Sequence, residues 1–392
     1  MRWTHPDHPD RLVRLGYCLN LRAAESLEEL LESLRAVILP LRDRLKVEGL
    51  FGVGMYVPAA LAGHLMSEEG AGEREELRSF LESERLDPFT WNAFPYGDFQ
   101  TDGLKEGVYE PIWTDARRAR YTLDVARLAQ AVAGDEARSH LSISTHGGRY
   151  GEWEGSESER ARGQLREVIE VLKSMEGAPV VLSVEAEPCS SATDTRAAAA
   201  WVADLRSAHM GLCLDCCHSA VEFEEVVDAL AFCQAAGLGK VQFSSALSLE
   251  APSQNAEGVD ALLALDEPRF LHQVTSPLEG LRAPDLQDLA SSLREDERWL
   301  DQPEWRCHFH VPVDLERFRG LGTTSAHADE LVSGLLHGPE TWSRGELHLE
   351  IETYTWSVIP GAPAEGDGLL DALEHEYAHV LGLLRAAGWS SD

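Results

Sequence analysis

The chain has 392 residues, of which 67 are Asp or Glu and 34 are Lys or Arg, so its formal charge is −33. A hydrophobic content of 44% and a charged content of 26% are typical of a folded globular protein and exclude a disordered one. The acidic excess argues against nucleic-acid binding, which depends on Lys and Arg neutralising phosphates. No apolar run approaches the roughly 20 residues that span a bilayer, and the first residues lack a signal-peptide core. We therefore expect a cytoplasmic protein without direct membrane insertion.

Short apolar runs alternate along the chain with longer segments of helical periodicity. The predicted strands are 15–21, 51–57, 88–95, 141–145, 179–187, 210–215, 240–245, 306–313 and 347–353. Helices are expected at 24–45, after Pro58, around Tyr121 to Leu128, at 164–175, after an N-cap at Thr193 or Asp194, at 221–235, at 326–337 and at 369–387.

Strands separated by helices over most of the chain predict βα units and a parallel sheet. No glycine-rich phosphate loop follows an early strand, so the pattern favours a (β/α)8 TIM barrel over an open dinucleotide-binding sheet. The sequence has nine strand candidates, whereas a (β/α)8 barrel has eight strands, and the sequence leaves open which candidate lies outside the barrel. Residues 247–303, with several Pro and acidic residues, are expected to form an insertion. We therefore predict one barrel domain over 1–392.

Polar side chains gather at the carboxyl ends of the later strands, where TIM barrels place their catalytic groups. Two-residue alternation puts Glu185 and Glu187 on one face of their strand, and Asp215 ends the next strand, with His218 three residues later. Three further strands carry polar residues on one face: Gln242 with Ser244, His308 with His310, and His348 with Glu350 and Glu352.

These side chains offer the oxygen and imidazole ligands that bind divalent metal ions. A bound ion could polarise a carbonyl or enediolate oxygen, while an unliganded Glu or His moves protons. A single acid at a strand end is more often a solvated charge or a helix cap, and a single His in a strand is more often a core residue. Five such strand ends in one chain favour a shared metal site.

One segment matches a different motif, the H-E-x-x-H pattern of zinc proteases, at His375-Glu376-Tyr377-Ala378-His379. Such a protease needs a third zinc ligand, and the only candidate in the 13 residues after His379 is Asp392. The motif also lies in the predicted closing helix, where His and Glu suit a solvated face. We therefore disfavour the protease interpretation.

The strand-end residues resemble the metal ligands of the xylose-isomerase-like barrel superfamily, which includes sugar-phosphate isomerases, epimerases and endonuclease-IV-type enzymes. The matching positions are Glu185 in LSVEAE, Asp215-x-x-His218 in LDCCH, and Glu352 in IETY. Sugar epimerases usually present a His on the seventh strand, where this chain offers Gln242, so His310 is an alternative ligand. The resemblance implies a divalent ion, Mn, Zn, Mg or Co, held by these residues.

The whole chain resembles the EboE family of metabolite traffic proteins. The resembling segments are LGYCLN (15–20), WNAFPYGDF (91–99), KEGVYEPIW (105–113), LSIST (141–145), VQFSSAL (241–247), FLHQV (270–274), HFHVPV (308–313) and LEIETYTW (349–356). Membership implies a role beside other products of a small bacterial gene cluster, including a membrane prenyltransferase-like protein. That cluster is linked to the delivery of a secondary-metabolite precursor.

From the residues and the resemblance together, we expect a metal-dependent isomerase- or epimerase-like enzyme that acts on a polar hydroxy-carbonyl metabolite. The candidate metal ligands are Glu185, Asp215, Glu352 and either Gln242 or His310. The candidate catalytic residues are Glu185, Glu352, His218 and His308, with Glu187 or Glu350 as a supporting group or base. The candidate substrate-binding residues are Asn20, Asn92, Tyr96, His146 and Glu187. An alternative role for Asn92 and Tyr96 is to stabilise a turn.

Two alternatives stay open on the same fold. The first is a non-catalytic carrier that holds a metabolite in the barrel mouth and hands it to partner proteins. The second is an endonuclease-IV-like phosphodiesterase, which the charge of −33 disfavours.

Overall fold

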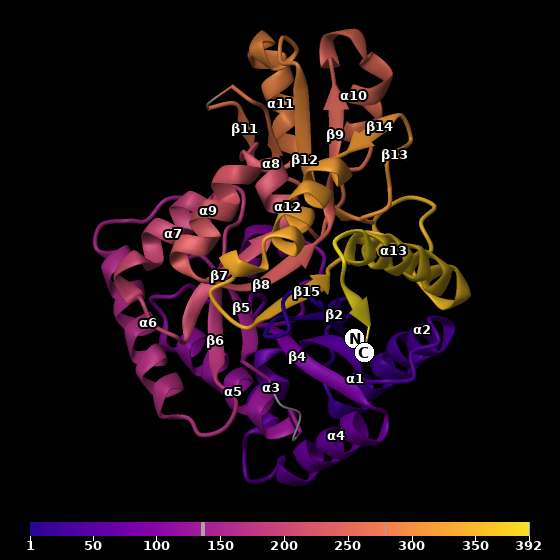
Figure 1. Cartoon of the computed structure of the whole chain (residues 1–392). Helices are drawn as coiled ribbons and strands as arrows, with labels where there is room; N and C mark the ends of the chain where they lie inside the picture. Colours follow the sequence, from indigo (N-terminus) through magenta and orange to yellow (C-terminus); the bar gives the residue numbers. More distant parts are fainter. Residues whose placement is uncertain (135–137, 279, 392) are drawn as a thin grey trace.

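A computed structural model describes residues 1–134, 138–278 and 280–391 (Figure 1). In this described part, eight parallel strands form a closed ring in the order β15-β8-β7-β6-β5-β4-β3-β2, with β2 pairing back to β15. The predicted (β/α)8 TIM barrel is therefore confirmed. Its strands are β2 (Leu12–Cys18), β3 (Phe51–Tyr56), β4 (Leu86–Asn92), β5 (Leu141–His146), β6 (Val180–Glu185), β7 (Met210–Asp215), β8 (Leu238–Phe243) and β15 (Glu346–Ile351).

The barrel strands are buried on both faces, as expected when helices cover the outside and side chains fill the inside. On β6, alternation turns Val180, Leu182 and Val184 to one face and Ser183 and Glu185 to the other. Small residues make room inside the ring: a Cβ atom at Gly54 would collide with the carboxylate of Glu350. The interior is thus tightly packed and contains polar groups.

Helices follow the barrel strands along the chain. Asp194, one of the two predicted N-caps, accepts a hydrogen bond from the backbone N–H of Ala197 and so begins α7. The covering helices are α1 (Leu27–Ser33) with a π-helical turn and α2 (Leu39–Arg44), α3 (Ala59–Leu65), α4 (Ala71–Ser83), α5 (Ala116–Val132), α6 (Glu157–Ser174), α7 (Thr195–Val202), α8 (Cys216–Val221), α9 (Val226–Ala236), α12 (Ser325–His337) and α13 (Gly366–Ala386).

The ninth strand candidate lies outside the barrel. It is β12 (Glu304–Val311), the centre of a second, antiparallel sheet with the order β11-β10-β12-β9-β14-β13 in the described chain. The other strands are β9 (Ser245–Glu250), β10 (Val274–Thr275), β11 (Arg282–Ala283), β13 (Arg317–Phe318) and β14 (Leu321–Thr323). The insertion therefore runs from β9 to β14 and continues past residue 303, where we expected it to end, because β12 pairs with β9 and not with a barrel strand.

The insertion projects from the barrel together with α10 (Ala256–Leu263) and α11 (Leu286–Glu295) (Figure 1). It has an apolar cluster of its own, with Trp299, Trp305 and Phe309 among its largest members. Its base meets the barrel through α8, which packs against β9 and β12. That the barrel and the insertion form one domain over 1–392 stays a prediction from the sequence.

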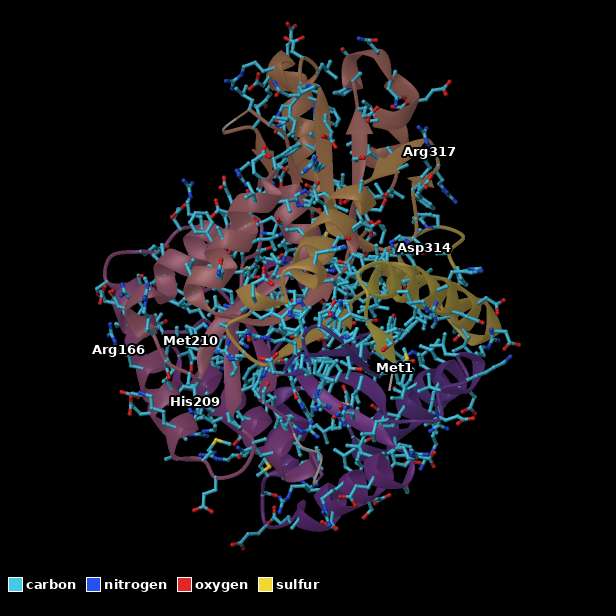
Figure 2. All side chains as sticks on the ribbon, in the orientation of Figure 1. Met1, Arg166, His209, Met210, Asp314 and Arg317 are labelled. Atoms are coloured by element: carbon cyan, nitrogen blue, oxygen red, sulfur yellow. The ribbon has the colours of Figure 1, made fainter. Side chains whose placement is uncertain are left out.

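The two ends of the described chain meet beside β2. The strand β1 (Arg2–Thr4) pairs with the first half of β2 and also with β16 (Ser390–Ser391). In Figure 2, Met1 lies beside the barrel and Arg317 lies out on the insertion, while side chains fill the ring of strands. Within the described residues, no helix is both long enough and apolar enough to cross a membrane.

Candidate metal centre

Three carboxylates meet at the carboxyl end of the barrel. Glu185 is the last residue of β6, Asp215 is the last residue of β7, and Glu352 directly follows β15. One oxygen of each lies within 4.8 Å of an oxygen of the other two, and the three residues are at most 3% exposed. Each also has one buried oxygen without a hydrogen-bond partner among the described residues. We call Glu185, Asp215 and Glu352 the carboxylate cluster.

Neighbouring polar groups fix the directions of these carboxylates. Glu352 Oε1 accepts hydrogen bonds from the amide nitrogens of Asn20 at 2.8 Å and Asn92 at 3.2 Å. Asp215 caps α8 by accepting from the backbone N–H of His218 at 2.9 Å, which explains the D-x-x-H spacing. The cluster is therefore held in place by the ends of strands and by one helix cap.

The carboxylates of the cluster repel one another when they are ionised. Burial raises the pKa of Glu185 well above its usual value, and the negative charges of Glu352 and Asp215 raise it further. Burial likewise raises the pKa of Glu352, with Glu350 and Asp215 adding to the effect. Such a cluster needs protons or a cation to be stable at neutral pH.

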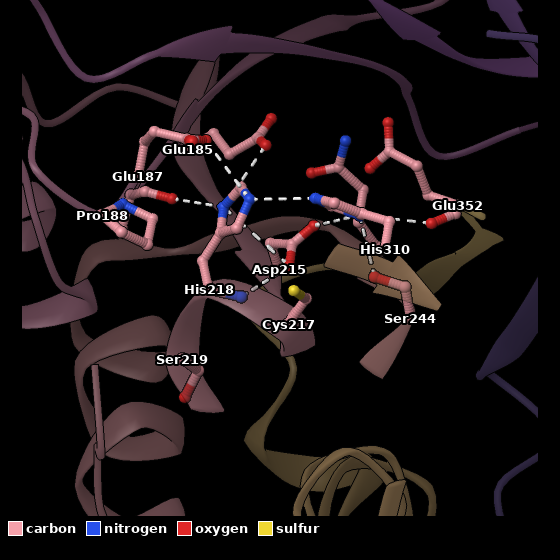
Figure 3. A network of polar contacts seen from close by, with 12 residues as sticks. Glu185, Glu187, Pro188, Asp215, Cys217, His218, Ser219, Ser244, His310 and Glu352 are labelled. Atoms are coloured by element: carbon pink, nitrogen blue, oxygen red, sulfur yellow. Dashed lines mark hydrogen bonds and ion pairs between the residues drawn. The ribbon is translucent and has the colours of Figure 1, made fainter. Parts of the chain in front are cut away.

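Three histidines form a second group beside the carboxylate cluster. The Nε2 atom of His218 lies 3.1 Å from His308 Nε2 and 3.2 Å from His310 Nε2, and the last two atoms are 2.8 Å apart. All three rings are nearly fully buried. We call them the imidazole cluster. Figure 3 shows His218 between Glu187 on one side and His310 on the other, above Asp215.

The imidazole cluster joins two parts of the molecule. His218 stands on α8, at the end of barrel strand β7, whereas His308 and His310 alternate on β12 of the insertion. His218 Nε2 is also 3.2 Å from Glu187 Oε2. Burial raises the pKa of Glu187 to about 7, and the nearby His218 opposes this shift.

A cavity of about 70 Å³ opens onto both clusters. Its lining includes most of the residues that the sequence singled out: Asn20, Asn92, Glu185, Glu187, His218, His308, His310 and Glu352. Asp215 is absent from this lining and lies behind it, within the carboxylate cluster. The structure thus brings together predicted residues from five separate strand ends and one helix.

Besides Asp215, the predicted residues Gln242, Tyr96 and His146 lie apart from the cavity lining. Gln242 accepts a hydrogen bond from Cys213 Sγ at 2.6 Å inside the barrel, so of the two alternatives for the strand-seven ligand, His310 is the one that reaches the cavity. The ring of Tyr96 packs edge-on against Tyr121. His146 is buried, and its Nδ1 accepts from the backbone N–H of Gly148, which is a turn contact.

Several residues of the cavity were missed by sequence reasoning. Gln273 and Tyr354 lie in segments that carry the EboE resemblance, but their residue types gave no chemical signal of their own. Arg269 and Lys105 line the mouth, and both are paired: Arg269 Nε with Asp102 at 3.0 Å, and Lys105 Nζ with Asp285 at 2.7 Å. Arg269 and Gln273 belong to the insertion, whereas Lys105 and Tyr354 follow the barrel strands β4 and β15.

A buried ion pair lies on the neighbouring part of the barrel interior. Lys240 on β8 pairs with Glu350 on β15, and both side chains are fully buried. Thr90 also donates a hydrogen bond to Glu350 at 3.3 Å. Glu350, which we considered as a base, is therefore held by a cation of the protein itself.

The structure rejects the zinc-protease interpretation of the closing helix. Glu376 is fully buried and accepts hydrogen bonds from the backbone N–H of Val313 at 3.2 Å and from Thr353 Oγ1 at 2.9 Å. His375 is exposed, and His379 pairs with Asp329 at 2.7 Å. Asp392, the candidate third ligand, lies outside the described residues. The motif packs a helix onto the barrel.

Comparison with known proteins finds similarity to solved structures only. No family model matches the chain, and neither does any curated protein. Among solved structures, it is similar to an L-ribulose 3-epimerase, with a TM-score of 0.49, 13% identity, and coverage of 96% of this chain and 95% of that one. It is also similar to the IolI protein with a bound zinc atom, with a TM-score of 0.48, 10% identity, and coverage of 95% and 99%.

A third similar structure is a xylose isomerase-like TIM barrel protein from Mycobacterium smegmatis in complex with magnesium, with a TM-score of 0.48, 10% identity, and coverage of 88% and 87%. The structural neighbours thus include epimerases and metal-bound barrels. Identities this low bear on the fold alone. Membership of the EboE family stays a prediction.

Proposed function

We propose that the chain is a metal-dependent enzyme of the sugar isomerase and epimerase type, acting on a polar hydroxy-carbonyl metabolite. The observation that carries this proposal is the carboxylate cluster at the catalytic end of a TIM barrel, in which three buried acids each present an oxygen that has no hydrogen-bond partner in the described part of the chain. Carboxylate oxygens are the ligands that Mg²⁺ and Mn²⁺ prefer. A divalent ion held by Glu185, Asp215 and Glu352 would supply Lewis acidity at a substrate oxygen.

The residues of this chain provide the remaining functions. Glu187 lines the cavity, and its pKa of about 7 suits a group that takes and returns a proton at neutral pH. Asn20 uses its amide nitrogen to hold Glu352. Its Oδ1 is buried and has no hydrogen-bond partner within residues 1–134, 138–278 and 280–391, so it can accept from a substrate hydroxyl. Asn92 is committed on both sides, to Glu352 and to the N–H of Phe94, and acts as a positioning residue.

Metal content tests the proposal first. Protein purified without chelator is analysed by elemental spectrometry, and we expect near-stoichiometric Mn, Zn, Co or Mg. Glu185→Gln and Glu352→Gln should lose an ion, whereas the control Glu170→Gln, which removes an exposed carboxylate paired with Lys173, should keep it. Absence of any ion, together with unchanged melting after ions are added, contradicts the proposal.

A proton-transfer assay distinguishes the enzyme proposal from the non-catalytic carrier alternative. We expect the loaded protein to exchange solvent deuterium into the carbon next to the carbonyl of a ketose or related hydroxy-carbonyl compound, followed by NMR. Glu187→Gln should slow this exchange by about 100-fold or more, because general acid–base catalysis contributes about 10²–10⁴-fold. The carrier alternative instead predicts ligand binding without exchange.

The finer assignments rest on resemblance. A place in the traffic of a secondary-metabolite precursor, a membrane prenyltransferase-like partner and a cytoplasmic location follow from the EboE resemblance or from the composition. Copurification of the chain with membranes that contain such a partner would support the first two.

A further inference from the structure

We infer that the substrate carries an uncharged apolar chain, and that this chain binds in a second cavity beside the metal centre. That cavity has a volume of about 730 Å³, against about 70 Å³ for the cavity that opens onto both clusters. It lies mainly between residues 19–37 and residues 354–370, and we call it the side groove. The reacting end of this substrate is that of the proposed function, on which the inference rests.

The side groove adjoins the metal centre through two shared side chains. Arg269 and Tyr354 line both cavities and so form the partition between them. The centre of the Tyr354 ring lies 4.6 Å from that of the His310 ring and 5.4 Å from that of the Phe270 ring. A molecule that is held at the carboxylate cluster and extends past Tyr354 therefore enters the side groove.

The floor of the side groove is apolar. Leu19, Trp356 and Leu369 line it, and all three are buried members of the main hydrophobic core. Leu21 and Val37 line it as well, and they are only partly buried against that core. An apolar chain in the groove would cover these partly exposed side chains, and the apolar surface of both would leave water.

The arginines of the side groove already have partners. Arg22 Nη2 pairs with Glu365 at 3.4 Å, and both side chains are exposed. Arg269 Nε pairs with Asp102 at 3.0 Å. An anionic chain would have to displace one of these ion pairs, and its charge would lose hydration against the apolar floor. An uncharged chain leaves both ion pairs intact.

The acids of the side groove offer little to a cationic chain. Glu29 and Glu32 line the groove at exposed positions, where an ion pair is worth at most about tenths of a kcal/mol to one. Glu29 is also engaged, because its Oε2 accepts a hydrogen bond from the backbone N–H of Glu25 at 2.8 Å. The lining as a whole therefore favours an uncharged chain.

Small side chains leave the side groove unfilled. Ala24 and Ala36 line it from one wall, and Ala364 lines it from the other. The π-helical turn over Leu34–Ile38 belongs to the first wall and brings Ala36 to the groove. Turns of this kind are rare and occur frequently at functional sites. The space is thus formed by the backbone path of both walls and by the short side chains on them.

A series of hydroxy ketones tests the inference in the full-length protein purified without chelator. The probes share the head of hydroxyacetone and carry straight alkyl chains of increasing length, up to hydroxyoctanone, and their dissociation constants are measured by calorimetry. We expect each added methylene to tighten binding by up to about fourfold, because each is removed from water in the groove. An affinity that is independent of chain length overturns the inference.

Two variants block the side groove from opposite walls. Ala36→Trp and Ala364→Trp each replace an exposed alanine, so they fill the groove without disturbing the core. Each should weaken the binding of hydroxyoctanone by at least about tenfold and leave that of hydroxyacetone unchanged. The control Ala231→Trp, at an exposed position on α9, should keep the dependence on chain length. A dependence that survives in both blocking variants overturns the inference, because the chain then binds elsewhere.

Deuterium exchange in the same probes separates the side groove from the proposed function. Hydroxyacetone has no chain to place in the groove, so its exchange reports the proposed reaction alone. Exchange without any dependence of affinity on chain length overturns the groove and leaves the proposed enzyme standing. A dependence that the blocking variants abolish, without exchange in any probe, supports the groove and removes the proposed enzyme activity.

Discussion

The two ends of the barrel bury charge in different ways. At the amino end, Arg14 pairs with Asp87 at 2.6 Å and with Glu346 at 2.9 Å, and Arg138 pairs with Asp87 at 3.0 Å. At the carboxyl end, the carboxylate cluster has no Arg or Lys pair in the described chain. The protein's own arginines neutralise the buried carboxylates at the amino end, whereas the carboxylate cluster needs protons or a cation from outside the protein.

Histidines at the two ends show the same contrast. His140 and His348 are stacked with ring centres 3.9 Å apart near the amino end. Their ring nitrogens all have protein partners, such as the carbonyl oxygen of Gly239 for His140 and Ser142 Oγ for His348. The Nε2 atoms of the imidazole cluster instead face one another and Glu187. Residue types alone would propose a metal site at both ends, and the hydrogen bonds favour only the carboxyl end.

The largest effect that we expect comes from breaking the amino-end network. Arg14→Met leaves Asp87 and Glu346 short of a buried partner and should destabilise the protein by about 3–5 kcal/mol, measured by urea unfolding. Lys173→Ala, which removes an exposed ion pair with Glu170, should cost less than about 1 kcal/mol. Equal costs for the two variants would mean that the buried network is not structural.

Glu376 provides a third way to bury a carboxyl, as a neutral acid. Burial raises its pKa from 4.5 to about 8 despite hydrogen bonds from Thr353 and Val313. Between these values the folded state keeps a proton that the unfolded state has lost, so the contribution of Glu376 to stability falls by roughly 1.4 kcal/mol per pH unit as pH rises. Glu376→Gln should therefore raise the melting temperature more at pH 7.5 than at pH 5. A gain that is independent of pH would show that Glu376 is ionised in the fold.

Metal ions should stabilise only the carboxyl end. Adding Mn²⁺ at 100 times its dissociation constant to chelator-treated protein should raise the free energy of unfolding by about 2.7 kcal/mol. Glu185→Gln should remove most of that gain, whereas His140→Ala, at the amino end, should keep it on top of its own destabilisation. An equal response in both variants would contradict the assignment of the ion to the carboxylate cluster.

The fold could be predicted from the sequence because its signals are local. Alternation on β6 and β7 and helical spacing in α5 each depend on neighbouring residues, and both indicated βα units. Glu185, Asp215 and Glu352 were placed at the catalytic end because parallel strands all end on one side of a barrel. His218 was noted only as following Asp215 by three residues, and the structure explains this spacing because Asp215 accepts from the backbone N–H of His218.

The rest depends on contacts between distant segments. Two-residue alternation is the same in a barrel strand and in the antiparallel strand β12, so the sequence could not decide where His308 and His310 belong. From the sequence, Glu350 was also treated as a free acid. In the structure, the parallel pairing of β15 with β8 sets Glu350 beside Gln242, and this register brings the Lys240 ammonium, two residues earlier on β8, to the Glu350 carboxylate. Tertiary pairing decided each of these points.

The smallest effect contrasts two acids that are two residues apart. In the metal-free protein, Glu352→Gln relieves repulsion from neighbouring carboxylates, while the new amide oxygen can still accept from Asn20 and Asn92, so we expect a gain on the order of 1 kcal/mol. Glu350→Gln is the matched control and should destabilise, because it leaves Lys240 buried without its partner. If the two variants change the free energy of unfolding in opposite directions in chelator-treated samples, Glu350 serves to stabilise the fold and Glu352 serves to bind an ion. A loss of stability in both variants would mean that Glu352 already has a cationic partner in the protein, and the carboxylate centre would then need no metal.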